Sequence, residues 1–145
     1  MLNMKELWHK MDNVYDLYAK TAGTNFTTLL ILQMLDLPEV YTQKRVCEEL
    51  GLPKQLVNSI IKALWLQKFV ELKEATDRRN KDIIVTTAGK EYIRKILDPL
   101  EAAELKAWED FSAEEIAAYA NATEKYTKSL EVALKNTTAQ KPPLL

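Results

Sequence analysis

The sequence predicts a mainly α (α+β) fold, in which several helices accompany one β-hairpin. Three observations lead to this prediction. Apolar residues recur at three- and four-residue spacings over most of the 145 residues, as they do on one face of a helix. The run 69–73 alternates apolar and polar residues, the run 82–86 is rich in β-branched residues, and the two flank the polar stretch 74–81, which is the pattern of a hairpin with a long loop. Only 3 Gly and 5 Pro are present, so little in the composition interrupts helices.

Composition also limits the classes of protein to which the chain can belong. Hydrophobic residues make up 47% and charged residues 28%, which is typical of a soluble domain with its own core. No apolar run approaches the roughly 18 residues that cross a bilayer, and charges near the N-terminus speak against a signal peptide. We therefore expect a cytoplasmic protein without membrane contact. Cys47 is the only cysteine and His9 the only histidine, so we expect no disulfide, no metal site and no cofactor.

Two helices are predicted in the first quarter of the chain. Apolar residues of 4–19 share one helical face, and Gly23 and Thr24 end this pattern. Either Thr24 or Asn25 can cap a second helix over 26–35. Because this second segment is apolar nearly all round, we expect it in the core.

Two further helices precede the hairpin. Thr42 is placed to cap a short helix that Gly51 ends, and Pro53 suits the first residue of a helix running to about Gln67. The latter helix has an apolar face and an opposite polar face about 140° wide. The polar face holds amides, one hydroxyl and two lysines but no acid, whereas a solvated face usually includes Glu. Its residues are Lys54, Gln55, Asn58, Ser59 and Lys62.

Two helices are predicted after the hairpin. Thr86 or Thr87 can cap the first of them, and Pro99 is expected at a bend or local kink. Ser112-Ala-Glu-Glu115 has the pattern of a capping box, so the last helix should begin near Ser112. The tail 137–145 is expected to be flexible.

Charge is distributed unevenly along the chain. Between Thr42 and Lys95, twelve Lys and Arg stand against seven Asp and Glu, a net charge of +5, while the remainder has eight against fourteen, a net charge of -6. A basic middle segment indicates a polyanionic partner. Solvated helices also vary in charge, so charge alone leaves both interpretations open.

Three helices followed by a hairpin is the order of a winged helix-turn-helix. Residues 42–52 read Thr-Gln-Lys-Arg-Val-Cys-Glu-Glu-Leu-Gly-Leu, 57–64 follow, and Asp77-Arg78-Arg79 precede Val85-Thr86 and Gly89. With these motifs in this order, the chain resembles the multiple-antibiotic-resistance regulator (MarR) family. The order of the helices extends the resemblance over nearly the whole chain.

The resemblance implies a single MarR-like domain over 1–145. Its winged helix-turn-helix would span about 25–97, and flanking N- and C-terminal helices, about 4–20 and 98–136, would form a dimerisation region. It further implies a homodimeric transcriptional regulator, most simply a repressor, that binds a pseudo-palindromic site in double-stranded DNA and responds to a small-molecule effector. No enzyme activity is expected. The alternative is a winged-helix module that binds another protein and no DNA.

The resemblance also assigns candidate DNA-binding residues. It makes 53–67 the recognition helix, where Gln and Asn can bond adenine edges and Lys can reach phosphate or guanine. The wing of this fold is the predicted hairpin, residues 69–86. There, Arg79 matches an Arg that a narrow minor groove attracts, and Asp77 would orient a neighbouring Arg. Lys68 stands where the family usually has Gly. The candidate DNA-binding residues are Thr42, Gln43, Lys44, Lys54, Gln55, Asn58, Ser59, Lys62, Asp77, Arg78, Arg79 and Lys81.

Apolar and aromatic residues gather in the two terminal helical regions, which interlock in the family. Aromatic side chains are enriched at protein interfaces, although these residues could instead line a small-molecule pocket. The candidate dimer-interface residues are Leu7, Trp8, Met11, Tyr15, Ile116, Tyr119, Thr123, Tyr126 and Leu130. Cys47 occupies an inward position of its helix, which favours core packing over a redox role.

Overall fold

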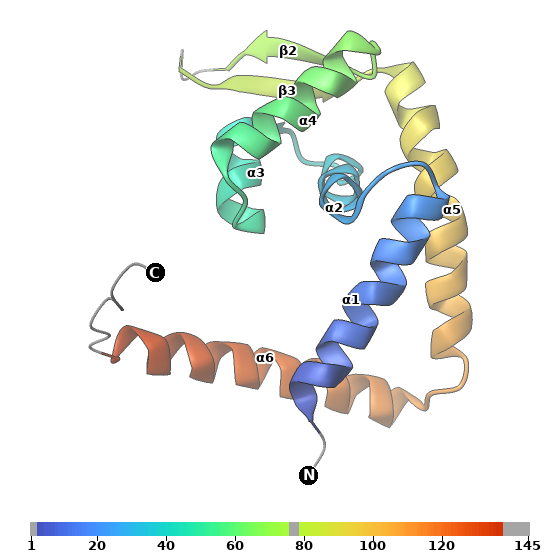
Figure 1. The fold of residues 1–145 in the computed structure, drawn as a ribbon, viewed down its shortest axis with the longest axis vertical. Helices are drawn as coiled ribbons and strands as arrows, with labels where there is room; N and C mark the ends of the chain where they lie inside the picture. Colours follow the sequence, from blue (N-terminus) through green and yellow to red (C-terminus); the bar gives the residue numbers. More distant parts are fainter. Residues whose placement is uncertain (1–2, 76–78, 138–145) are drawn as a thin grey trace. The chain divides into compact units, whose positions relative to one another are not determined.

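The computed structural model describes residues 3–75 and 79–137, so most of the predicted flexible tail lies outside the described residues. In this part the fold is mainly helical with a small antiparallel sheet, which confirms the predicted fold class (Figure 1). The elements in chain order are α1 (Met4–Thr21), α2 (Phe26–Leu35), β1 (Tyr41–Thr42), α3 (Gln43–Leu50), α4 (Lys54–Leu66), β2 (Val70–Glu74), β3 (Lys81–Val85), α5 (Thr87–Trp108) and α6 (Ala113–Lys135).

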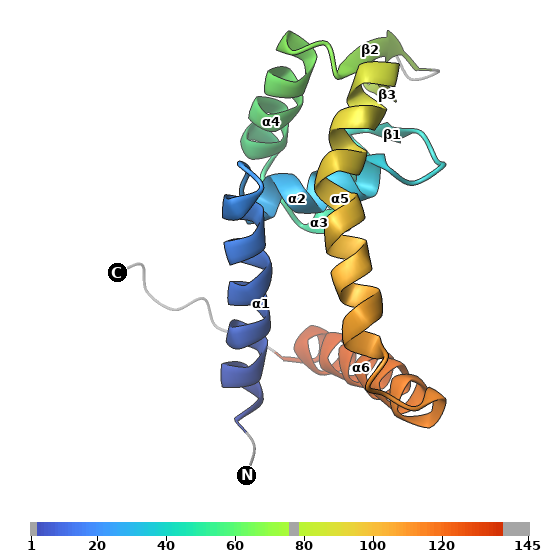
Figure 2. The same ribbon diagram turned by 90° about the vertical axis from the view of Figure 1, so that its right-hand side faces the viewer.

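The chain divides into two compact units, one up to Glu101 and one from Ala102 onward. The first unit contains α1 to α4, the sheet and most of α5. Figures 1 and 2 both show α2 at the centre of this unit, and its apolar side chains explain that position. The core of the unit includes Ala19, Leu29, Ile31, Leu32, Val46, Val57, Ile61, Val70, Ile83, Ile93 and Leu97.

The helix ends follow the local signals of the sequence. Asn25 caps α2, because its side-chain oxygen accepts from the backbone N–H of Thr28 at 2.8 Å. Ser112 and Glu115 form the predicted capping box at the start of α6, with reciprocal bonds of 3.1 and 2.8 Å. Pro53 is predicted as the first residue of its helix, but this prediction is wrong by one residue. It is the N-cap of α4, with extended backbone at ψ 141°.

The sheet has the strand order β1-β3-β2, with β3 in the centre and all pairs antiparallel. The hairpin strands β2 and β3 pair from Val70 opposite Val85 to Glu74 opposite Lys81. The two-residue strand β1 was not predicted. It pairs Tyr41 with Ile83, and two residues are too few to show an alternating pattern.

A close backbone contact fixes α5 to the base of the wing. The Thr86 hydroxyl donates to the Lys68 carbonyl at 2.7 Å and accepts from the Gly89 N–H at 3.0 Å, so Thr86 is the residue that caps α5. The Thr86 N–H donates to the Phe69 carbonyl at 3.0 Å. A Cβ on Gly89 would lie 2.0 Å from the Phe69 carbonyl oxygen. Position 89 therefore requires glycine because no side chain fits in the space there, and not because its φ is positive.

Lys68 adopts a left-handed conformation, with φ at 64°. Its N–H bonds the Trp65 carbonyl, and the Phe69 N–H bonds the Leu64 carbonyl. This pair of bonds is a Schellman motif, which most often carries glycine at the left-handed position. Lys68 thus occupies a position whose backbone conformation glycine adopts more readily.

Lys68→Gly is expected to raise the free energy of unfolding by about 1 kcal/mol, because a side chain in the left-handed region costs roughly 1–2 kcal/mol and glycine loses part of this gain through chain entropy. Urea unfolding followed by circular dichroism measures the change. Gln67→Gly is the matched control. Gln67 has φ at -84°, so glycine there should lower stability. A decrease for Lys68→Gly would contradict the strain at this position.

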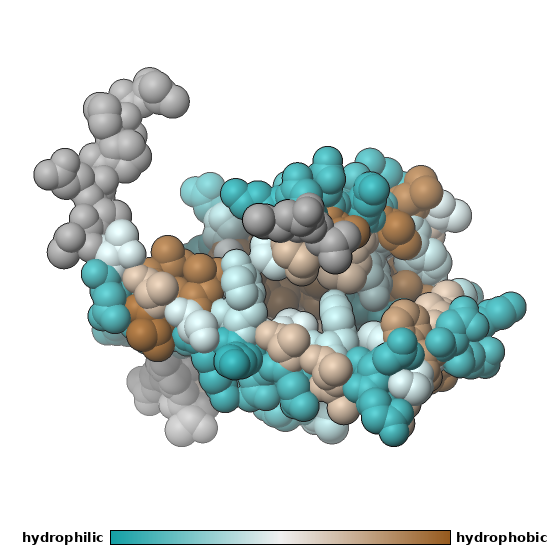
Figure 3. Space-filling view, turned by 90° about the horizontal axis from the view of Figure 1, so that it is seen from below, coloured by the Kyte–Doolittle hydropathy of each residue, from teal (hydrophilic) through white to brown (hydrophobic). Residues whose placement is uncertain are grey.

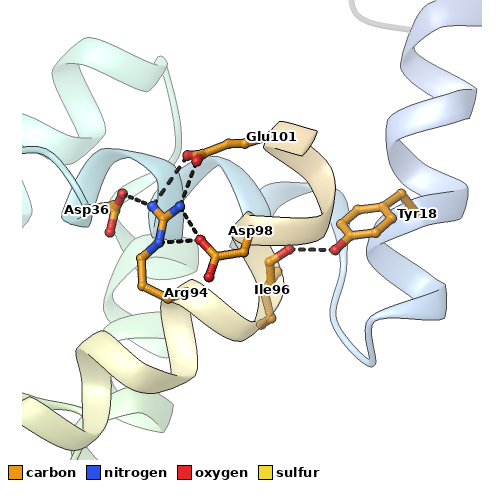
Figure 4. A network of polar contacts seen from close by, with 6 residues as sticks. All are labelled: Tyr18, Asp36, Arg94, Ile96, Asp98 and Glu101. Carbon is orange, nitrogen blue, oxygen red and sulfur yellow. Dashed lines mark hydrogen bonds and ion pairs between the residues drawn. The ribbon is translucent and has the colours of Figure 1, made fainter. Parts of the chain in front are cut away.

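Arg94 of α5 joins the C-terminal end of α2 to α5. Its guanidinium bonds Asp36 at 2.6 Å, Glu101 at 2.6 Å and also Asp98 (Figure 4). The Tyr18 hydroxyl donates to the Ile96 carbonyl, which attaches α1 to the same stretch of α5. Pro99 lies inside α5, and the helix continues past it.

Candidate nucleic-acid interface

α3, α4 and the wing border one hollow on the surface of the first unit. Its volume is about 560 Å³. Six of the predicted DNA-binding residues line it, namely Gln43, Lys44, Lys54, Asn58, Arg79 and Lys81. These residues come from three elements, so the fold brings together positions that are up to 38 residues apart (43 to 81).

The orientation of α4 explains which of its side chains can meet a ligand. Val57, Ile61 and Leu64 are buried against the core, which fixes the rotation of the helix about its axis. As a consequence, the polar face points outward. Its residues Lys54, Gln55, Asn58, Ser59 and Lys62 are all exposed.

The lining of the hollow is positively charged. It contains Lys44, Lys54, Arg79 and Lys81 and one acid, Glu48. Glu48 lies 4.0 Å from the ammonium of Lys44 in an exposed i,i+4 pair, which water screens strongly. The surplus of cations therefore favours an anionic ligand.

The N-terminus of α4 adds to this positive character. Side chains cap α1, α2, α3 and α6, whereas the N-cap of α4, Pro53, makes no side-chain hydrogen bond. The first N–H groups of an uncapped helix remain available as donors, and the helix dipole places partial positive charge there. Lys54 extends from this helix end into the hollow.

Arg45 of α3 and Arg94 of α5 are occupied within the fold. The Arg45 guanidinium bonds Glu49 at 2.8 Å and Glu39 at 3.0 Å, and it lies 4.4 Å from the centre of the Tyr41 ring. The hydrogen bonds to Glu49 and Glu39 raise the pKa of Arg45, and those to Glu101 and Asp98 raise the pKa of Arg94. Both residues hold elements together and so contribute little to the positive hollow.

Other predicted site residues have mixed positions. The Thr42 hydroxyl accepts from the backbone N–H of Arg45 at 3.2 Å, so it caps α3. Asp77 and Arg78 lie outside the described residues. Leu72 and Asn80 also line the hollow, together with the half-buried Cys47. The sequence offered one signal for Asn80, its position between Arg79 and Lys81.

The predicted interface residues lie on α1 and α6. Exposed apolar side chains on α1 include Leu7, Trp8 and Met11. Tyr15 is half-buried, and the centre of its ring lies 6.5 Å from that of the Phe26 ring. On α6 every residue is exposed, including Ile116, Tyr119, Thr123, Tyr126 and Leu130. Figure 3 shows hydrophobic areas between hydrophilic ones on the face that is viewed.

Within the second unit, a small aromatic group joins the end of α5 to α6. The Trp108 ring lies 5.2 Å from Phe111 and 5.9 Å from Tyr119. Tyr119 is nevertheless exposed. This group can orient the start of α6, along which no residue is buried.

Residues 3–75 and 79–137 contain no helix with the length and hydrophobicity of a membrane span. No group of three His, Cys, Asp or Glu side chains in the same ranges is arranged to hold a metal ion.

Known protein structures provide the comparison for this fold. No family model and no curated protein matches the sequence. A MarR family regulator from Neisseria meningitidis aligns with a TM-score of 0.77 at 23% identity, covering 93% of this chain and 98% of that chain. The Staphylococcus aureus regulator MepR in its DNA-binding conformation aligns with a TM-score of 0.73 at 20% identity, covering 88% and 95%. The chain has the winged-helix fold of the MarR family regulators.

Proposed function

We propose that the protein is a DNA-binding transcriptional regulator of the MarR type. The observation that carries the proposal is the positively charged hollow, where the start of α3, the first half of α4 and the wing converge. A winged helix-turn-helix places its recognition helix, here α4, in the major groove and its wing beside that helix. The acid-free face of α4 has the amide and lysine side chains that suit base edges and phosphates.

The wing and the recognition helix would divide the work of binding. Asn58, Gln55 and Ser59 on α4 can bond base edges, while Lys44, Lys54 and Lys81 neutralise phosphates. Arg79 would enter or border the minor groove, where a narrow groove concentrates negative potential.

The protein would act as a homodimer. Helices in proteins draw most of their stability from packing. The amphipathic 23-residue helix α6 has no buried residue, so it would have little stability in a monomer. A second copy is the occupant that fits, since two winged helices related by two-fold symmetry match a pseudo-palindromic site. α1, the end of α5 and α6 would then form the dimerisation region.

Regulation would follow from the separation of the two winged helices. A small-molecule effector that binds better to a dimer with an unsuitable separation would lower DNA affinity by shifting the population. Blocking a promoter is the simplest consequence of such binding, so we propose a repressor.

DNA affinity is expected to fall steeply as salt rises. Each neutralised phosphate contributes a slope of about -0.9 to log K against log salt concentration. Fluorescence anisotropy with a promoter fragment from the protein's own locus measures this slope. Arg79→Ala should weaken binding about tenfold, which is the order of one lost charged contact, while Arg79→Lys should restore part of it.

Lys128→Ala on α6 serves as the control, because its ammonium pairs with Glu124 at 2.8 Å within the same helix. Its DNA affinity should equal that of the wild type. An affinity for DNA that does not change between low and high salt would contradict the phosphate contacts. Absence of any binding, together with a stable complex with another protein, would favour the protein-interaction alternative.

A further inference from the structure

The central strand β3 has an open edge beyond β1. Strand β1 covers only Asp82 and Ile83. The antiparallel register would place Glu39 opposite Val85, but the chain has left the sheet there, because β1 begins only at Tyr41. The edge of β3 from Ile84 to the start of α5 therefore has no neighbouring strand on this side.

Hydrogen bonding shows which way the backbone of Val85 points. The Thr86 N–H donates to the Phe69 carbonyl, so this pair is hydrogen-bonded across the hairpin. Because hydrogen-bonded and non-hydrogen-bonded pairs alternate in antiparallel sheets, the next pair, Val70 and Val85, is not. The N–H and C=O of Val85 thus face the β1 side, and no partner for them occurs among residues 3–75 and 79–137.

A second hollow lies along this open edge. Its volume is about 430 Å³, within the usual 300–1,000 Å³ of ligand sites. Leu35, Ile83 and Ile93 form buried apolar walls. Leu37 and Val40, in the loop that leaves the sheet, also line it and are 50% and 52% exposed. An occupant would cover both.

The charges around this hollow are balanced, unlike those of the first hollow. Asp36 and Glu39 line it, but Arg94 holds Asp36 at 2.6 Å and Arg45 holds Glu39 at 3.0 Å. Lys90 and Arg94 complete the polar lining. A strongly charged ligand is therefore not favoured. The features that remain are apolar walls and an unpaired backbone donor and acceptor.

We propose that this hollow binds a short extended peptide segment with apolar side chains, which adds to β3 beside Val85 in continuation of β1. Addition of a strand to an open sheet edge obtains affinity from main-chain hydrogen bonds and specificity from pockets for alternate side chains. Only two or three residues fit, since α5 begins at Thr87. The proposal does not depend on DNA binding.

The test uses the full-length protein, labelled with nitrogen-15, and the tripeptide acetyl-Val-Leu-Val-amide. In the free protein the Val85 amide should exchange with solvent at least tenfold faster than the Ile84 amide, whose groups face β2. Addition of the tripeptide should shift the Val85 amide resonance and slow its exchange. If the Val85 amide is already protected, or does not respond to millimolar peptide, the proposal is wrong.

Two controls distinguish strand pairing from non-specific hydrophobic binding. A fully N-methylated tripeptide keeps the apolar body but cannot pair, and it should not shift the Val85 amide. Equal binding of both peptides would overturn the proposal. Val40→Asp should raise the dissociation constant at least fivefold, whereas Leu66→Asp, at an exposed apolar residue of α4, should leave it unchanged. Equal effects of the two variants would also overturn it.

Discussion

Replacing Gly89 by Ala is expected to lower the free energy of unfolding by about 3 kcal/mol. The added methyl group would lie 2.0 Å from the carbonyl oxygen of Phe69 and 2.9 Å from a methyl group of Val85. The first of these atoms belongs to the backbone at the base of the wing, so it cannot move aside as a side chain could. Overpacking of this kind typically costs about 1–3 kcal/mol, and more where the backbone must shift. The hairpin and the start of α5 should separate.

Gly51→Ala is the matched control for this variant. Gly51 ends α3 with φ at 62°, and a Cβ there would meet no atom within 4 Å. The same substitution thus introduces backbone strain without a clash and should cost about 1 kcal/mol. Urea unfolding at equal protomer concentrations compares the two, because the stability of a dimer depends on concentration. A Gly89→Ala cost no larger than that of Gly51→Ala would show that the close contact is absent.

Replacing Leu130 by Asp is expected to weaken homodimer formation by about 1,000-fold. A two-fold interface contains each changed residue twice, so two carboxylates would enter an apolar contact without partners. Each such burial costs several kcal/mol, and about 4.1 kcal/mol already corresponds to a 1,000-fold change in the dissociation constant. Sedimentation velocity over a range of concentrations should show a dimer for the wild type and a monomer for the variant.

Asn121→Asp supplies the control on the same helix. Asn121 precedes Leu130 by nine residues, which at 100° per residue places it on the opposite side of α6. It introduces the same charge and should leave the dimer intact. If Leu130→Asp sediments like the wild type, the apolar strip of α6 does not form the interface. A monomeric wild type would reject the dimer itself.

The helix ends could be predicted because their determinants are local. The cap bonds of Asn25, Thr42 and Ser112 each reach a residue three positions later, so a short window of sequence contains both partners. Pro53 was misplaced by one residue, because a residue that lacks an N–H and has φ near -61° fits both the cap and the first helical position.

Features that depend on distant partners could not be predicted in the same way. β1 forms because Tyr41 pairs with Ile83, and the sequence of 41–42 contains no local signal for that pairing. The left-handed Lys68 is held by α4 and by the Thr86 hydroxyl, although glycine would be the expected residue. For the candidate site, the polar face of α4 was readable from its period, whereas the hollow depends on how the wing is placed beside α3 and α4.

The internal pairing of Arg45 and Arg94 changes the meaning of the basic middle segment. Its net charge of +5 counts both guanidiniums, yet five carboxylates in two groups surround them. Without these two guanidiniums, the lining of the hollow between α3, α4 and the wing still holds four cations against one acid, Glu48. A chromosome offers about a million or more non-specific sites to a DNA-binding protein. Because Arg45 and Arg94 are paired within the fold, they would add little to the affinity of the proposed regulator for those competing sites.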